Sequence, residues 1–342
     1  MSATSETMET IDIGTSGIAA SRIGLDTGPI GRWAWGGNTA DLVRSMSTIR
    51  SAIERGITLI DTAPVYGFGL AERMVGTVLS DGLRARAIIA TQTGLEWRDG
   101  KVRRNSSPAH VRREAEQSLR RLRTDHIDLY IVRWSDPLTP IHETAKTLAR
   151  LLQEGKIRAI GVSNYSPAQM DEFRQAAPIH ALQAAYNLFE HEAEGSVVSY
   201  AKRHNIAVLC HDTLSRALLT GPIPATARLQ GNGLRRHDPT FHEAGLSEVA
   251  SAASALDRHA RACYGVPLIA LAARWVLDQE NTVALWSAQR PEQLDPLKTA
   301  MGWRLDDMMK RRIETIVRHT VKDPTGPRFM PPPSRSELAL VE

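Results

Sequence analysis

The stretch Thr58-Leu-Ile-Asp61-Thr-Ala-Pro-Val-Tyr66-Gly-Phe-Gly-Leu-Ala-Glu72 joins an apolar run to a polar loop and then to a helical pattern. The apolar run ends on Asp61, and a carboxylate at that place would be costly to bury without a partner. Asp61 is therefore either a functional carboxylate with a partner or a helix cap, and the pattern fits both roles. The stretch therefore predicts a β-strand whose carboxyl end carries a candidate functional group.

Short apolar runs of this kind recur along the chain and alternate with longer helical patterns. Such alternation indicates a parallel sheet with crossover helices, and eight parallel strands are the number that closes a barrel. The predicted fold is therefore an α/β protein of the (β/α)8 TIM barrel class. The predicted strands cover residues 22–25, 58–61, 87–91, 126–132, 159–163, 181–184, 207–210 and 283–286.

Helical signals fill the intervals between these strands. Apolar residues three or four positions apart predict a helix over 41–55, which stops at Gly56. A serine followed by a proline is a common N-cap and first-turn pair, and it precedes the predicted helices 108–122 and 168–176. A further apolar helix is predicted over 267–277.

Three segments fall outside the alternation. Residues 11–20 predict a short hairpin that plugs the bottom of the barrel, and 212–245, rich in Gly, Pro and Arg, predict a long loop followed by a helix. Long loops after barrel strands usually carry function. We expect one barrel over residues 1–322 and an extended, proline-rich C-terminal tail over 323–342, either a loose terminus or a lid.

A doubly wound open sheet that binds a dinucleotide is the alternative architecture. Its G-x-G-x-x-G fingerprint follows the first strand and opens a helix. The nearest glycines, Gly28, Gly31, Gly36 and Gly37, do not lie in that context. The barrel is therefore the preferred fold.

Composition narrows the classes of function. The 342 residues carry a net charge of +4 without a block of Lys or Arg, so we expect no nucleic-acid partner. Cys210 and Cys263 give neither a disulfide framework nor a metal site, and both are expected to be buried, reduced thiols. Without a signal-peptide pattern or an apolar run of about 18 residues, the sequence predicts a cytoplasmic protein with no membrane partner. A small-molecule substrate and a homo-oligomer both suit this profile.

Polar residues stand where the predicted strands end. Catalytic groups of parallel barrels gather at the carboxyl ends of the strands. In this chain those positions hold Asp61, Gln92, Arg133, Ser163, Asn164, Gln183, His211 and Asp212.

Several of these segments resemble the aldo-keto reductase family. Asp61 and Tyr66, five residues apart and ahead of a helix, are similar to its signature. The other matching motifs are Ile127-Asp-Leu-Tyr-Ile-Val-Arg-Trp-Ser-Asp136, Gly155-Lys-Ile-Arg-Ala-Ile-Gly-Val-Ser-Asn164, Gln183-Ala-Ala-Tyr-Asn187, Trp275-Val-Leu-Asp and Ala288-Gln-Arg-Pro-Glu-Gln-Leu294. The resemblance implies a (β/α)8 barrel that binds NADP(H) in an extended form and transfers hydride to a carbonyl, with a tyrosine as proton donor.

Two members of the catalytic tetrad implied by this resemblance match, and two are replaced. Asp61 and Tyr66 match, whereas Gln92 stands at the family's lysine and Arg133 at its histidine. The chain has 35 Arg and 7 Lys, and none of the lysines precedes Lys101, so no shift of the alignment recovers the missing one. Gln92 brings no charge, and Arg133 cannot donate a proton at working pH.

Three roles stay open for Arg133. In the first, Arg133 pairs with Asp61 and restores the charge of the missing lysine. In the second, its planar guanidinium binds a carboxylate or phosphate of the substrate. In the third, it only neutralises Asp61 in a site that is no longer catalytic.

The resemblance also implies residues for the cofactor. Ser163, Asn164 and Gln183 match a trio that holds the carboxamide, His211 stands where a stacking aromatic is common, and Gln293 matches an adenine-side contact. Gln289 stands where a cation commonly faces the ribose phosphate, a charge that the neighbouring basic residues Arg216 and Arg290 are able to supply.

A substrate pocket walled by aromatic side chains is expected beside these residues. Aromatic walls suit a small apolar or ring-bearing substrate. The candidate pocket residues are Asp26, Trp33, Trp35, Trp97 and Trp134. The leading hypothesis is an NADP(H)-dependent oxidoreductase for a small carbonyl or alcohol, weak on standard aldehydes. A lyase, dehydratase or isomerase on the same scaffold, and a catalytically impaired binding protein, are the alternatives, because residues on both the hydride side and the proton side are changed.

Overall fold

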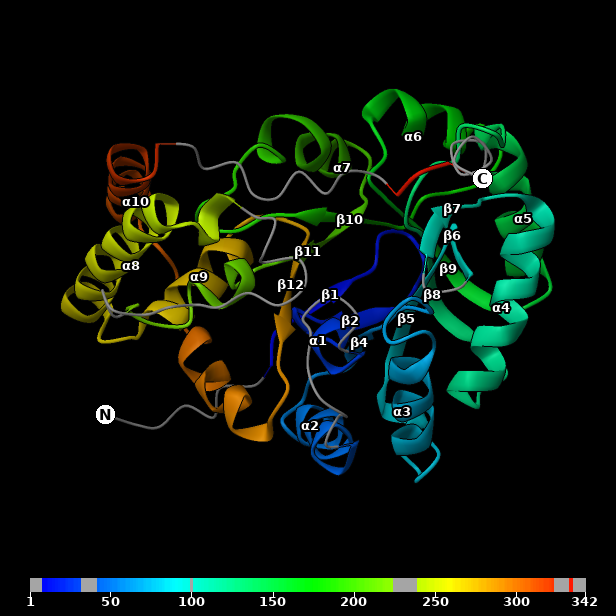
Figure 1. Ribbon diagram of the computed structural model, residues 1–342, viewed down its shortest axis with the longest axis horizontal. Helices are drawn as coiled ribbons and strands as arrows, with labels where there is room; N and C mark the ends of the chain where they lie inside the picture. Colours follow the sequence, from blue (N-terminus) through cyan, green and yellow to red (C-terminus); the bar gives the residue numbers. More distant parts are fainter. Residues whose placement is uncertain (1–7, 32–41, 99–100, 224–238, 323–331, 335–342) are drawn as a thin grey trace.

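Eight parallel strands close into a barrel in the computed structural model of this chain (Figure 1). The structure describes residues 8–31, 42–98, 101–223, 239–322 and 332–334. In barrel order the strands are β10 (Ala181–Ala185), β11 (Ala207–His211), β12 (Thr282–Ser287), β3 (Ile23–Asp26), β4 (Leu59–Asp61), β5 (Ile88–Thr93), β8 (Ile127–Val132) and β9 (Ile157–Ser163). All eight predicted strands are present, so the (β/α)8 fold is confirmed and the doubly wound alternative is wrong.

Helices form the outer layer of the barrel (Figure 1). The predicted helices correspond to α2 (Leu42–Glu54), α4 (Pro108–Leu122), α6 (Pro167–Arg174) and α9 (Leu268–Leu277). The remaining helices are α1 (Gly28–Gly31), α3 (Leu70–Leu79), α5 (Ile141–Gln153), α7 (Ser199–Arg203), α8 (Glu243–Tyr264) and α10 (Asp307–Thr320).

Local sequence decides where two of these helices begin. Pro108 occupies the first turn of α4, directly after Ser107. At the start of α6, Ser166 Oγ accepts a hydrogen bond from the backbone N–H of Gln169 at 3.2 Å, and Gln169 Oε1 accepts one from the N–H of Ser166 at 2.9 Å. This reciprocal capping box satisfies two N–H groups that lack partners within the helix.

The barrel interior is a packed apolar core that the N-terminal hairpin closes from below. β1 (Thr10–Asp12) pairs antiparallel with β2 (Ala19–Ser21). Ile13, Ile18 and Ala20, in and beside this hairpin, belong to the same buried cluster as side chains inside the barrel. The predicted hairpin plug is therefore confirmed.

A second hairpin, absent from the sequence prediction, lies beside the barrel mouth. β6 (Leu95–Arg98) and β7 (Lys101–Arg104) pair antiparallel, and Leu95 is buried against Ala63 and Val65 of the loop after β4. The C-terminal segment reaches this hairpin, because the N–H of Arg104 donates to Pro333 O at 3.0 Å. The rest of the predicted tail lies outside the described residues, as does 224–238 of the predicted long loop.

The expectation for the two cysteines is half wrong. Cys210 is buried, but Cys263 is exposed. On α8 the inward positions advance from Leu256 to Ala260 and then, four residues on, to Tyr264, which packs against the core. This spacing turns Cys263 away from the barrel.

Two searches of the described residues bear on membranes and metals. No single helix there has both the length and the apolarity to cross a bilayer, although residues 245–264 of α8 and helix α9 meet the length and composition criteria together as a pair bent by 81°. No group of three or more His, Cys, Asp or Glu side chains with metal-binding geometry occurs among the described residues either.

Candidate active site

Arg133 and Tyr66 meet at the mouth of the barrel. Tyr66 lies in the turns between β4 and α3, and Arg133 directly follows β8. Arg133 Nη1 donates to the Tyr66 hydroxyl at 3.2 Å and to Gln92 Oε1 at 2.5 Å. The guanidinium carbon lies 5.8 Å from the centre of the Tyr66 ring, within cation–π range. A permanent cation therefore contacts the tyrosine from strand β8, and Gln92 on β5 holds that cation in place.

Asp61 is connected to this cation through two amides. Gln92 Nε2 donates to Gln183 Oε1 at 3.1 Å, and Gln183 Nε2 donates to Asp61 Oδ1 at 3.1 Å. Each amide therefore accepts on the side of Arg133 and donates toward the carboxylate. Within the described part of the chain no direct ion pair joins Arg133 to Asp61, so the pairing considered from the sequence is replaced by a relay of hydrogen bonds.

Two carboxyl groups lie close enough to affect each other at this end of the barrel. Asp26 accepts from the N–H of Gly28 at 2.8 Å and from the Ser287 hydroxyl at 2.7 Å. Burial raises the pKa of Asp26. Burial also raises the pKa of Asp61 well above its usual value, and the nearby Asp26 raises it further, while Arg133 acts in the opposite direction. The arginine thus faces two acids that are costly to ionise.

The tyrosine keeps its proton strongly in this environment. Burial raises the pKa of Tyr66 above its usual value of 10.0, and Arg133 opposes that rise. Burial by itself would lower the pKa of Arg133, but Tyr66, Asp61 and Asp26 outweigh it and raise the pKa instead. The resting site therefore holds a neutral phenol and a charged guanidinium.

Aromatic and apolar side chains surround the tyrosine. Tyr66, Trp97 and Trp134 pack against a small buried cluster that includes Leu95. The rings of Trp97 and Phe68 lie 5.7 Å apart between centroids. Trp97 and Trp134 are therefore near Tyr66 as expected, whereas Trp33 and Trp35 lie outside the described residues.

The residues expected to hold a carboxamide are only partly available for it. Ser163 ends β9, and Asn164, next to it, has a left-handed backbone with φ 59°. Asn164 Nδ2 donates to the backbone carbonyl of Arg133 at 2.9 Å. The structure brings Gln183 into the hydrogen-bond relay to Asp61 instead, so both ends of its amide already have partners.

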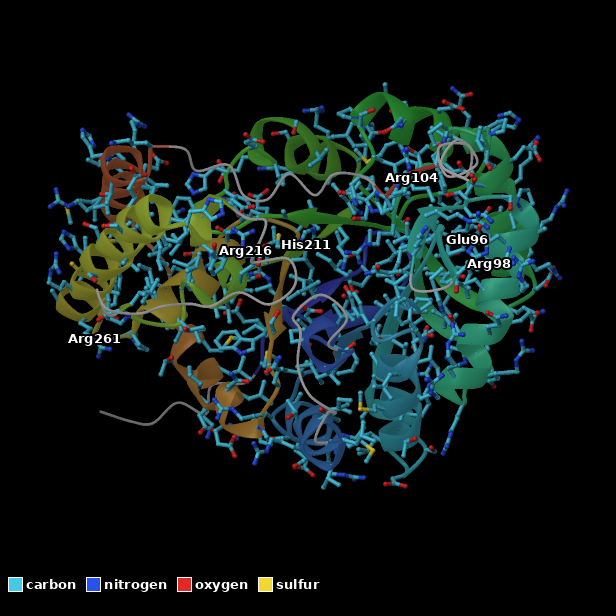
Figure 2. The ribbon with its side chains drawn as sticks, in the orientation of Figure 1. Glu96, Arg98, Arg104, His211, Arg216 and Arg261 are labelled. Carbon is cyan, nitrogen blue, oxygen red and sulfur yellow. The ribbon has the colours of Figure 1, made fainter. Side chains whose placement is uncertain are left out.

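Another arginine, Arg216, is buried past the end of β11. Arg216 Nη1 contacts Asp212 Oδ2 at 3.0 Å, and Nη2 contacts Glu190 Oε1 at 3.3 Å. Burial raises the pKa of Glu190 to about 7, and Asp212 adds to the shift. Burial lowers the pKa of the neighbouring His211 to about 3, with help from Arg133 and Arg216, so its ring is neutral. Figure 2 shows His211 and Arg216 on the β11 side, away from Glu96, Arg98 and Arg104 at the β6–β7 hairpin.

The residues expected near the adenine and ribose phosphate gather after β12. Gln293 Oε1 accepts from the N–H of Gln289 at 2.7 Å and from the N–H of Arg290 at 3.1 Å. Gln289 Nε2 donates to Pro29 O at 3.3 Å. Arg290 is exposed, and its side chain remains accessible to an anion.

Four side chains at or beside the site did not emerge from the sequence. They are Phe68, whose ring lies tilted against Trp97; Glu190, which pairs with Arg216; and Thr93 and Glu114, which line a pocket beside Arg133. Glu114 carries the one sequence signal among them, a charged residue on the inward stripe of a predicted helix. The other three side chains contact segments that are distant in sequence and come together only when the barrel closes.

Comparison with known proteins agrees with this geometry. The model of the Aldo/keto reductase family matches residues 29–318. The chain is 48% identical to aldo-keto reductase YhdN of Bacillus subtilis, over 97% of this chain and 100% of that protein. It is 32% identical to the NADH-specific methylglyoxal reductase of Escherichia coli, over 91% of this chain and 100% of that protein.

Solved structures give the same result. The glycerol dehydrogenase AKR11B4 from Gluconobacter oxydans superposes with a TM-score of 0.85 at 42% identity, covering 95% of this chain and 99% of that one. An aldo/keto reductase from Klebsiella pneumoniae in complex with NADP and acetate superposes with a TM-score of 0.71 at 25% identity, covering 91% and 96%. The barrel, the Asp61 and Tyr66 pair at its mouth and these matches lead to one conclusion: the chain belongs to the aldo/keto reductase family.

Proposed function

We propose that this protein is an NADP(H)-dependent oxidoreductase for small carbonyl and alcohol substrates, with Arg133 in place of the cation that a lysine would supply. The contact that carries the proposal is the hydrogen bond from Arg133 Nη1 to the Tyr66 hydroxyl at 3.2 Å. A fixed cation beside a phenol stabilises the phenolate that forms when the proton leaves. Of the three roles considered for Arg133, this geometry favours charge replacement, though toward Tyr66 and not Asp61.

The donor set around the barrel mouth fits a nicotinamide dinucleotide. Ser163 and Asn164 offer hydroxyl and amide groups suited to a carboxamide, and Arg290 is an exposed guanidinium suited to a phosphate. Arg216 would have to exchange its bonds to Asp212 and Glu190 for a phosphate. The cofactor supplies a hydride to the substrate carbon. Because one relative contains NADP and another is named as NADH-specific, both cofactors belong in the assay.

The protein's own part of the reaction is to position the substrate and move one proton. In reduction, Tyr66 donates its hydroxyl proton to the carbonyl oxygen as that oxygen gains negative charge. Arg133 keeps its proton throughout, because its pKa is raised, and stabilises the tyrosinate that remains. Gln92 and Gln183 fix the guanidinium relative to Asp61, while the rings of Trp97 and Phe68 pack together beside the tyrosine.

Short oxygenated substrates are the class that we propose. The relatives named above act on glycerol and on methylglyoxal, both three-carbon molecules. A wall built from Trp97 and Trp134 beside the polar Tyr66 and Arg133 suits a small molecule with one apolar and one oxygen-bearing side. Membership of the family favours redox chemistry over the lyase, dehydratase or isomerase hypothesis.

Other expectations from the sequence remain part of this proposal. They are one barrel over residues 1–322 with a tail over 323–342, a cytoplasmic location and a homo-oligomer. Size-exclusion chromatography with light scattering checks the last of these.

Steady-state assays with purified protein test the proposed reaction. Wild-type protein is expected to oxidise NADPH in the presence of methylglyoxal or dihydroxyacetone, and Tyr66→Phe is expected to reduce kcat by about 10²-fold or more, since general acid catalysis contributes about that much. Unchanged cofactor binding by Tyr66→Phe serves as the control for folding. Wild-type protein that binds neither NADPH nor NADH would support the impaired binding protein instead.

A further inference from the structure

Asp26 has no part in the reaction described so far. It ends β3, and in the register of the barrel it lies directly opposite Asp61 on β4. The two acids differ in access, because Asp61 is 1% exposed and already accepts from Gln183, whereas Asp26 is half-buried. Substrates of barrels of this class bind at the carboxyl ends of the strands. Of the two acids at this end, Asp26 is therefore the one that a substrate can reach.

The carboxylate of Asp26 keeps capacity for further hydrogen bonds. Oδ1 accepts one from the N–H of Gly28, and Oδ2 accepts one from the hydroxyl of Ser287. An ionised carboxylate offers about four lone-pair positions, so these two neutral donors use about half of them. Among the residues that the structure describes, no cation forms an ion pair with Asp26, and Arg133 acts on it only at longer range. A partly buried carboxylate with only neutral partners is costly for a fold, and such groups gather at functional sites.

Gly28 lets this carboxylate approach Tyr66. A Cβ atom at position 28 would lie 3.0 Å from Asp26 Oδ1 and 3.4 Å from Cζ of Tyr66, the ring carbon that carries the hydroxyl. Because glycine has no Cβ, no side chain from this position separates the acid from the phenol. Asp26 also raises the pKa of Tyr66, in agreement with that closeness.

The charges around Tyr66 restrict the kind of substrate that fits. A substrate carboxylate would be repelled by Asp26, and a substrate ammonium group would be repelled by Arg133, which donates to the Tyr66 hydroxyl. A neutral molecule with a carbonyl and an adjacent hydroxyl suits both neighbours. Its carbonyl oxygen accepts a hydrogen bond from Tyr66, and its hydroxyl donates one to the carboxylate of Asp26.

We propose that Asp26 accepts a hydrogen bond from a hydroxyl group next to the reacting carbonyl, and so selects α-hydroxyketones and α-hydroxyaldehydes over carbonyl compounds without that hydroxyl. The inference rests on the proposed reductase function and names the substrate class of the same site. Asp26 is a specificity-determining residue in this scheme, because it contacts the substrate but takes no part in proton or hydride transfer. In the oxidative direction the same contact selects vicinal diols.

A pair of ketones of nearly equal shape tests this selection. Hydroxyacetone and butanone differ by a hydroxyl in place of a methyl group, and kcat/KM is measured for both with NADPH and with NADH. Because the hydroxyl also alters the intrinsic reactivity of the carbonyl, the decisive quantity is the hydroxyacetone-to-butanone ratio of kcat/KM, compared between variants. Effects of a substitution on Tyr66 or on the cofactor act on both ketones and cancel in this ratio.

Asp26→Ala is expected to lower this ratio about 10- to 100-fold, the contribution of one hydrogen bond to a charged group. Asp26→Asn keeps the shape and one acceptor oxygen, so it is expected to lower the ratio by a smaller factor. Asp12→Ala is the matched control, because Asp12 is an exposed acid of the hairpin at the opposite end of the barrel. It is expected to keep the wild-type ratio. Melting temperatures show which variants fold.

A wild-type ratio in folded Asp26→Ala would overturn the proposal, and a raised KM for NADPH beside that unchanged ratio would assign Asp26 to the cofactor instead. If Asp26→Ala does not fold, the ratio in Asp26→Asn decides between the same outcomes. Reduction of methylglyoxal but not of hydroxyacetone by wild-type protein would also overturn it. Absence of any reduction of these carbonyl compounds with either cofactor would instead reject the proposed function on which the inference rests.

Discussion

Arg133 and Arg216 both lie at the carboxyl end of this barrel, and their surroundings differ in one decisive way. Arg216 contacts the carboxylates of Asp212 and Glu190 directly. Arg133 is linked to Asp61 through glutamine amides and not by an ion pair. Its own hydrogen bonds go to Gln92 and to the hydroxyl of Tyr66. The same residue type is therefore neutralised in one cluster and left to act on a phenol in the other.

The difference indicates how neutral amides can hold a charge without an ion pair. A carboxylate in direct contact with Arg133 would cancel much of the positive potential at Tyr66. Amide groups hold the guanidinium in place by hydrogen bonds without cancelling its charge. Gln92 is itself uncharged, but its side-chain oxygen holds a cation that approaches from the neighbouring strand. We expect Arg133 to determine rate and Arg216 to determine stability and cofactor affinity.

Replacing Arg133 is expected to have the largest effect. Arg133→Met should lower kcat about 10³-fold, since a single preorganised charge at a transition state contributes roughly that much, and should leave the melting temperature within a few degrees of wild type. Stopped-flow measurement of NADPH oxidation, with circular dichroism for folding, checks both. A stable variant that retains full kcat would remove the distinction between the two arginines.

Replacing Arg216 is expected to give the opposite pattern. Arg216→Met leaves the half-buried Asp212 and Glu190 without their cation, which should cost about 2–3 kcal/mol of stability at pH 8, while kcat at saturating cofactor changes less than about threefold. Urea denaturation and steady-state kinetics measure the two quantities. Large loss of kcat with unchanged stability would show that the clusters have been assigned the wrong way round.

The acid beside Arg216 is expected to have a smaller, pH-dependent effect. Because the pKa of Glu190 is raised from 4.5 to about 7 on folding, the folded state holds its proton longer than the unfolded state. This contribution to stability is therefore complete below pH 4.5 and is lost as pH rises to 7.

In wild-type protein the free energy of unfolding should fall by about 1–3 kcal/mol between pH 4.5 and 7 because of Glu190. Glu190→Gln should remove this decrease. Thermal unfolding across this range measures it, with Asp81→Asn as a control, since that carboxyl lies on the surface. An equally steep pH dependence in Glu190→Gln would assign the titration to another group.

The fold followed from local patterns, and the site followed only in part. Strands β4 and β8 were predictable because apolar runs end on polar residues at the same edge of a parallel sheet. The hairpin of β6 and β7 was not, because Leu95 becomes buried, and Val102 half-buried, only against the loop that carries Tyr66. Nor does sequence spacing reveal that Arg133 reaches past Asp61 to Tyr66, since that contact depends on side-chain direction across the closed barrel.

The same limit applies to the cofactor side. Asn164 and Gln293 stand at strand and helix ends that sequence patterns locate well. Gln183, in contrast, is turned inward to Asp61 by a hydrogen bond between residues 122 positions apart. Long-range pairing of this kind follows from barrel closure and not from any local signal.

Chemical rescue of Arg133→Ala tests the central claim most directly. The truncated side chain leaves space beside Tyr66 for a small cation, so millimolar guanidinium should restore NADPH-dependent reduction saturably, with no comparable gain in Arg216→Ala. Full activity of Arg133→Ala without added guanidinium, or equal rescue of both variants, would contradict the account that Arg133 supplies the charge on which Tyr66 depends.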